Sequence, residues 1–166
     1  YTILIHAEIE HYLESIALRV LAHVRNRFIS GVVTRPLLCV LATFMDGNSE
    51  VSFNPDERLL LRVERWNSSA EKWMLHCYGQ MNYVIQNNNG LMEKNIKKMF
   101  GPFGLEVANV DSVFLANLDD LGRRRGAIAH NHYGMYQLKP AADHRQLSSD
   151  ILAGLPDFLE EVRNLR

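Results

Sequence analysis

RRRGAIAHN, residues 123–131, is the most informative segment of the chain. Three consecutive arginines precede the small apolar run Ala127–Ala129, which is followed by His130 and Asn131. An arginine is always charged and can pair with two phosphate oxygens at once, whereas a histidine gains or loses a proton near neutral pH. The apolar run indicates that the segment is anchored in a core. These residue types therefore suit a site that holds a phosphate and transfers protons beside it.

A predicted helix runs directly into this segment, with Asp111 as its N-cap. Its inner face carries Phe114, Leu115, Leu118 and Leu121. At about 100° per residue, Arg125 and His130 would lie about 140° apart around such a helix. A site within one chain then needs a break at Gly126 or a long side-chain reach, and a second copy of the chain could complete it instead. The alternative is a basic helix terminus that interacts with the helix dipole, with His130 as a capping residue.

The rest of the chain is typical of an all-α protein. Apolar residues recur at steps of three and four along residues 3–28, which predicts a long amphipathic helix that ends at Gly31. Residues 35–44 fit a helix or a strand, and Pro36 favours a helix. Further helices are predicted from Asn54 to Trp66, from Ser68 to Gln86, from Met92 to Phe100, and from about Ser149 onwards. We therefore expect a helical bundle of about five or six helices in one domain, residues 1–166.

Two features of that bundle concern its loops and its N-terminus. The run Asn87–Gly90 is expected to end the preceding helix with residues that tolerate left-handed backbone. The chain begins at Tyr1, inside a predicted helix, so we interpret the N-terminus as cropped.

The composition of the chain excludes several classes of function. The net charge of −1 excludes a generally basic coat for nucleic acid, so any contact with RNA must rest on a local patch. Cys39 and Cys77 are far apart and lack a metal-binding spacing, which predicts buried thiols in a reducing compartment and a cytoplasmic location. The seven histidines show no HExxH motif and no Cys/His spacing, and His130 and His132 are two apart, which suits a metal on an extended segment but not on a helix. We expect no metal site and no cofactor. The sequence has no apolar run of about 18 residues, so no membrane span is expected.

The spacing of the arginines and the histidine resembles the signature of the HEPN superfamily. Six, five and four residues separate Arg123, Arg124 and Arg125 from His130, and the signature is an arginine, four to six residues, and a histidine. Other segments resemble the RiboL-PSP type of HEPN domain. They are HAEIEHYLE at 6–14, NGLMEKN at 89–95 and LDDLG at 118–122, with Pro140 and the Leu155 helix in the places of the last turn and helix.

The resemblance implies a helical bundle that dimerises and acts as a metal-independent endoribonuclease, often as a toxin or in antiviral defence. It places the catalytic residues at Arg125 and His130. Many active HEPN domains have a polar residue after the motif arginine, where this chain has Gly126, although the arginine–glycine pair fits the RiboL-PSP type. A cognate antitoxin or a regulatory protein is an expected partner. The alternative is a non-catalytic helical module that binds RNA or a protein.

Other polar residues are candidates for roles around this pair. Glu10 shares a helix face with His6 and Glu14, which is a solvated charged face in the simpler interpretation. In the functional interpretation Glu10 orients Arg125 or His130, since similar HEPN domains often have an acidic side chain near this pair. Contacts with RNA are assigned to Arg123, Arg124, Asn131 and Tyr133, the last by stacking on a base.

Overall fold

The computed structural model describes residues 1–45, 70–130 and 140–165, and within these ranges it contains helices but no β-strand. The described residues contain six α-helices and two 3-10 helices, η2 (Gly101–Phe103) and η3 (Val107–Asn109). The α-helices are α1 (Thr2–Ile29), α2 (Arg35–Met45), α4 (Ala70–Gln86), α5 (Glu93–Phe100), α6 (Ser112–His130) and α7 (Ala141–Arg163). The predicted all-α bundle is confirmed.

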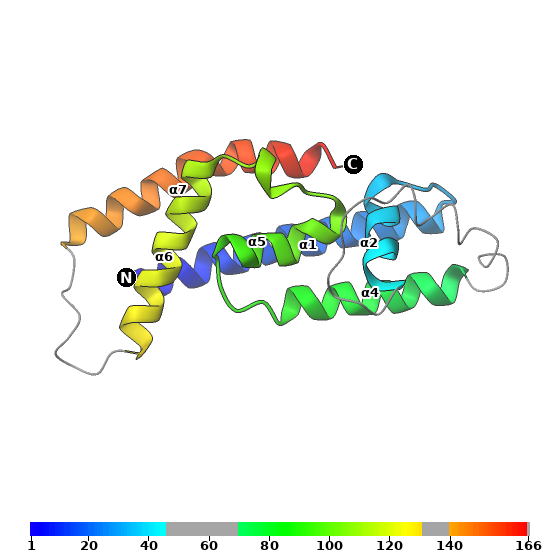
Figure 1. The fold of residues 1–166 in the computed structure, drawn as a ribbon, viewed down its shortest axis with the longest axis horizontal. Helices are drawn as coiled ribbons and strands as arrows, with labels where there is room; N and C mark the ends of the chain where they lie inside the picture. Colours follow the sequence, from blue (N-terminus) through cyan, green and yellow to red (C-terminus); the bar gives the residue numbers. More distant parts are fainter. Residues whose placement is uncertain (46–69, 131–139, 166) are drawn as a thin grey trace.

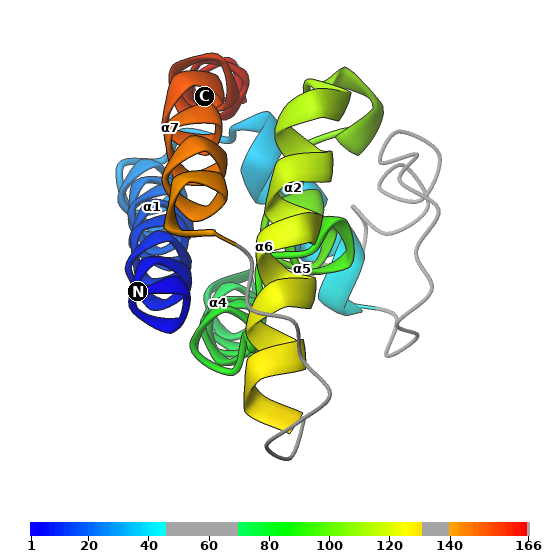
Figure 2. The same cartoon turned by 90° about the vertical axis from the view of Figure 1, so that its left-hand side faces the viewer.

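The helices are arranged around α1, which runs through the length of the molecule (Figure 1). It contacts α2, α4, α5 and α6, while α7 packs mainly on α6. The start of α1, the last turns of α6 and the start of α7 lie at the same end of the molecule in both views (Figures 1 and 2). This arrangement brings the starts of the first and last helices to the segment with the three arginines.

Most predicted helices agree with the structure to within a few residues. Residues 35–44 form a helix, and Asp111 accepts a hydrogen bond from the Val113 N–H at 3.0 Å, as expected of an N-cap. The predicted helix from Asn54 to Trp66 and the predicted start at Ser68 lie outside the described residues.

The predicted start of the last helix near Ser149 is wrong, because α7 already begins at Ala141. Its first two turns carry one buried apolar residue, Leu147, and therefore lack the periodicity that marks an amphipathic helix. Polar contacts with α1 and α6 stabilise these turns instead. A break at Gly126 is also excluded, since α6 continues through that residue to His130.

The core between α5, α6 and α7 is built on three phenylalanines. The ring of Phe158 lies 5.2 Å from that of Phe100, edge to face, and is stacked on that of Phe114 at 5.4 Å, both measured between centroids. Gly154, one turn before Phe158 on α7, makes room for Phe114. A Cβ atom at Gly154 would lie 2.8 Å from Cδ2 of Phe114, closer than atoms can approach without a shift.

We expect Gly154→Ala to destabilise the protein. Replacing a glycine inside a helix with alanine normally stabilises by about 0.5–1 kcal/mol, whereas overpacking a core costs about 1–3 kcal/mol. The cost of the clash with Phe114 should therefore exceed the gain in helix stability. Urea unfolding should show that the free energy of unfolding falls by about 1 kcal/mol. Gly79→Ala is the matched control, because a Cβ atom at Gly79, inside α4, would have no other atom within 4 Å, and this variant should be stabilised. Equal gains in both variants would contradict the close contact.

Candidate active site

The three consecutive arginines of α6 lie in three different environments. Arg123 is exposed, Arg124 is buried and Arg125 is half-buried. Successive residues of a helix point about 100° apart, so one of three neighbours can face the core while another faces solvent. The triplet therefore does not form one continuous basic surface.

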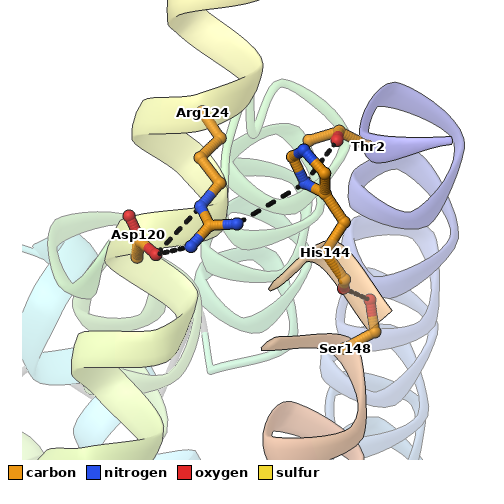
Figure 3. A network of polar contacts seen from close by, with 5 residues as sticks. All are labelled: Thr2, Asp120, Arg124, His144 and Ser148. Carbon is orange, nitrogen blue, oxygen red and sulfur yellow. Dashed lines mark hydrogen bonds and ion pairs between the residues drawn. The ribbon is translucent and has the colours of Figure 1, made fainter. Parts of the chain in front are cut away.

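Arg124 is held in a polar network that joins three helices (Figure 3). Its Nε and Nη2 atoms donate to Oδ2 of Asp120 at 3.0 and 2.7 Å, and its Nη1 lies 3.5 Å from Nδ1 of His144. The hydroxyl of Thr2 lies 2.9 Å from the same Nδ1. Because a guanidinium can only donate, the contact between Arg124 and His144 is a hydrogen bond in the tautomer in which Nδ1 of His144 accepts.

This network ties the first residue of α1 and the first turn of α7 to the middle of α6. Ser148 adds to it by donating to the backbone oxygen of His144 at 2.8 Å. The contacts of Arg124 therefore give it a structural role, and its predicted contact with RNA stays an untested prediction.

Arg125 faces the start of α1. Burial lowers the pKa of His6, and the charge of Arg125 lowers that pKa further. Burial raises the pKa of Glu10, as does the neighbouring Glu14, whereas Arg125 and a backbone hydrogen bond from Gly90 act against this rise. Arg125 is thus close enough to influence both groups, and the Nδ1 atom of His6 lies 3.4 Å from Oε2 of Glu10.

The structure therefore brings together Arg125 and Glu10, two of the three predicted catalytic residues. His130, the third, is the last residue of the same helix as Arg125. Asn131 and Tyr133 lie outside the described residues, and their predicted contacts with RNA stay predictions.

Three further residues, His6, Asn88 and Asn95, lie around Glu10 although the sequence pattern assigns them no role in the site. His6 is 2% exposed and lies against Glu10. Asn88 reaches the α1 carboxylates with its side chain, and Asn95 donates to Oδ1 of Asn88 at 3.0 Å. No residue other than glycine has a positive φ among the described residues, so the asparagines after α4 do not act through left-handed backbone. The sequence signal that could have identified these residues is the polar face of α1 together with the asparagine-rich loop at residues 87–89.

The segment LDDLG at 118–122 positions α5. The backbone N–H of Glu93, at the first position of α5, donates to Oδ1 of Asp119 at 2.8 Å. A Cβ at Gly122 would lie 3.2 Å from Cγ of Met92, so glycine permits the close approach of this loop to α6. The two aspartates thus have separate structural roles, because Asp120 pairs with Arg124.

Three further features of the described part of the chain concern metal ligands, membranes and the two cysteines. No group of three or more His, Cys, Asp or Glu side chains is placed there to hold a metal ion. None of its helices is long and apolar enough to cross a membrane. Cys39 and Cys77 are both buried, and burial raises the pKa of Cys77 to about 11, which makes it a poor nucleophile near neutral pH.

The helical bundle and its arginine–histidine helix define a HEPN-type domain. The chain matches the RiboL-PSP-HEPN family model over residues 1–163, which is nearly its whole length. The chain belongs to that family, and this membership indicates an RNA-related function. No curated protein and no solved structure gives a significant match to the chain.

Proposed function

We propose that this protein is a metal-independent endoribonuclease that cleaves single-stranded RNA. The observation that carries the proposal is that α6 packs on α1 and that the charge of Arg125 on α6 acts on His6 and Glu10 on α1. The fixed positive charge of Arg125 and the carboxylate of Glu10 then lie where α6 contacts α1. His130 is on the same helix as Arg125, five residues further along. The family membership supports the same assignment.

In the proposed mechanism the 2′-hydroxyl of the RNA attacks the adjacent phosphorus. His130 takes the hydroxyl proton and returns a proton to the 5′-oxygen that leaves, so the products are a cyclic phosphate and a 5′-hydroxyl. Arg125 stabilises the charge that develops on the phosphoryl oxygens, and Glu10 orients Arg125. Arg123, Asn131 and Tyr133 bind the flanking RNA, with Arg123 acting by attraction to the backbone.

The test uses a single-stranded RNA oligonucleotide and the same oligonucleotide with 2′-deoxy sugars. We expect cleavage of the RNA to continue in excess EDTA, cleavage of the 2′-deoxy strand to be absent, and mass spectrometry to find cyclic phosphate ends. Cleavage of the deoxy strand would show that the 2′-hydroxyl is not the nucleophile. Loss of cleavage in EDTA, restored by a divalent metal ion, would contradict a metal-independent reaction.

We also propose that the active form is a homodimer with two-fold symmetry. The helix α6 is continuous, so Arg125 and His130 are about 140° apart around its axis and point in different directions. In a two-fold dimer, the second copy can bring its own arginine or histidine to the same site. Apolar side chains are exposed at this end of the molecule, since Ile3 and Leu4 on the first turn of α1 are 51% and 70% exposed.

Light scattering at micromolar concentration should therefore report a dimer. Leu4→Glu should give a folded monomer that has lost RNA cleavage, because a charge would enter the predicted interface. Leu75→Glu is the control, because Leu75 is 57% exposed near the start of α4, at the other end of the molecule (Figure 1), and it should leave dimer and activity unchanged. A wild-type monomer that cleaves at full rate would exclude the composite site.

The biological setting follows from the resemblance alone. We propose a toxin or an antiviral defence effector that acts in the cytoplasm, with a cognate antitoxin or a regulatory protein as its partner.

A further inference from the structure

The side chain of Asn88 lies at the centre of the polar groups behind the candidate site. It is 6% exposed, in the connection between α4 and α5. Its Nδ2 atom donates to the backbone oxygen of Gly90 at 2.9 Å and lies 3.3 Å from Oε1 of Glu14 and 3.5 Å from Oε1 of Glu10. An amide nitrogen carries two hydrogens, so one is directed to Gly90 and the other is shared between the two carboxylates.

The orientation of this amide is fixed from the other side. Nδ2 of Asn95, on α5, donates to Oδ1 of Asn88 at 3.0 Å, so the nitrogen of Asn88 must face the carboxylates. Gly90 leaves room for this contact, because a Cβ there would lie 3.1 Å from Oδ1 of Asn95. The donor is therefore preorganised by α5 and does not depend on a mobile surface side chain.

The amide of Asn88 offsets the repulsion between two neighbouring carboxylates. Glu10 and Glu14 are one turn apart on α1 and both are partly buried, and the charge of Glu14 disfavours the charged form of Glu10. The groups that face Glu10 are His6 and Glu14 from α1, Arg125 from α6, and Asn88 and Gly90 from the loop after α4. A hydrogen bond to a carboxylate stabilises its charged form.

We propose that Asn88 is a positioning residue that bridges Glu10 and Glu14 and thereby keeps the Glu10 carboxylate in place as the negative partner of Arg125. This inference rests on the proposed function only for its effect on cleavage. The bridge itself is a property of the folded chain and can be measured without RNA.

The direct test is an NMR titration of the folded protein labelled with carboxyl-¹³C glutamate, with the Glu10 signal assigned from Glu10→Gln. Asn88→Leu removes the donor at similar volume, so the midpoint of the Glu10 titration should move to higher pH. Asn89→Leu is the matched control, because the neighbouring Asn89 is exposed and its amide bonds to Asn87, and the midpoint should not move. A folded Asn88→Leu variant with the wild-type midpoint overturns the proposal.

A second variant covers the case in which Asn88→Leu does not fold. Asn95→Ala keeps the Asn88 donor but frees its orientation, so the midpoint of Glu10 should move in the same direction by a smaller amount. An unchanged midpoint in folded Asn95→Ala would also overturn the proposal.

Cleavage provides a separate readout. A carboxylate that is protonated more readily loses its charge at higher pH, so the acid limb of the rate profile should move to higher pH in Asn88→Leu. A purely structural role would lower the rate at every pH and leave the limb in place, which contradicts the bridge. If the midpoint moves but wild type cleaves no RNA, the bridge stands and the proposed ribonuclease function fails.

Discussion

His130→Ala is expected to abolish RNA cleavage while the protein stays folded and dimeric. Removing a general acid–base group usually costs about 10²–10⁴-fold in rate. His130 is the last residue of α6, where alanine is a favourable helix residue, so the substitution should leave the helix intact. Single-turnover cleavage of a defined RNA, with circular dichroism on the same sample, measures both properties.

Two comparisons make this result specific. His76→Ala should cleave at the wild-type rate, because His76 is exposed on α4, which is not among the main contacts of α6. His132 is the nearest histidine that could replace His130, so residual activity in His130→Ala should disappear in the double variant with His132→Ala. A folded His130→Ala variant that cleaves at the wild-type rate would show that His130 is not catalytic.

Arg125→Lys should also cause a severe loss, although the charge is retained. Lysine lacks the planar fork that binds two phosphoryl oxygens, and loss of one such transition-state contact costs about 10²–10³-fold. The retained charge should still act on His6 and Glu10, so their titrations should change little. Impaired cleavage with preserved titrations would separate the geometry of Arg125 from its charge.

The other two arginines provide the comparison. Arg123 is exposed, so Arg123→Ala should weaken RNA binding mildly, with a reduced dependence on salt. Arg124→Ala breaks the pair with Asp120 and should lower thermal stability more than it lowers the rate of cleavage per folded molecule. An alanine series in which Arg125 is the most tolerant of the three would refute this assignment.

The long helices could be predicted from the sequence because each buries one apolar face. The periodicity of residues 3–28 predicts α1 to within a residue at each end, and Asp111 marks the start of α6. The first two turns of α7 could not be predicted in this way. Polar contacts such as that between His144 and Thr2 hold them, and these involve residues far apart in the chain.

The candidate site could be predicted only in part, for a similar reason. The residue types identify Arg125 and Glu10, and their proximity depends on how α6 crosses α1. Which arginine is buried depends on where α7 packs, and no local pattern in RRRGAIAHN contains that information. The role of Asn88 depends on the loop before α5 reaching two carboxylates on α1.

The contact between Thr2 and His144 has a consequence for the order of folding during synthesis. It joins residues 142 positions apart, so α1 must wait for α7 before its first turn is secured. The partners of Glu10 also arrive late, since Arg125 is made more than a hundred residues after it. Closing so long a loop is slow compared with forming local helices. A nascent chain on the ribosome, surrounded by RNA, therefore carries the residues of the candidate site but does not bring them together until most of the described helices have emerged.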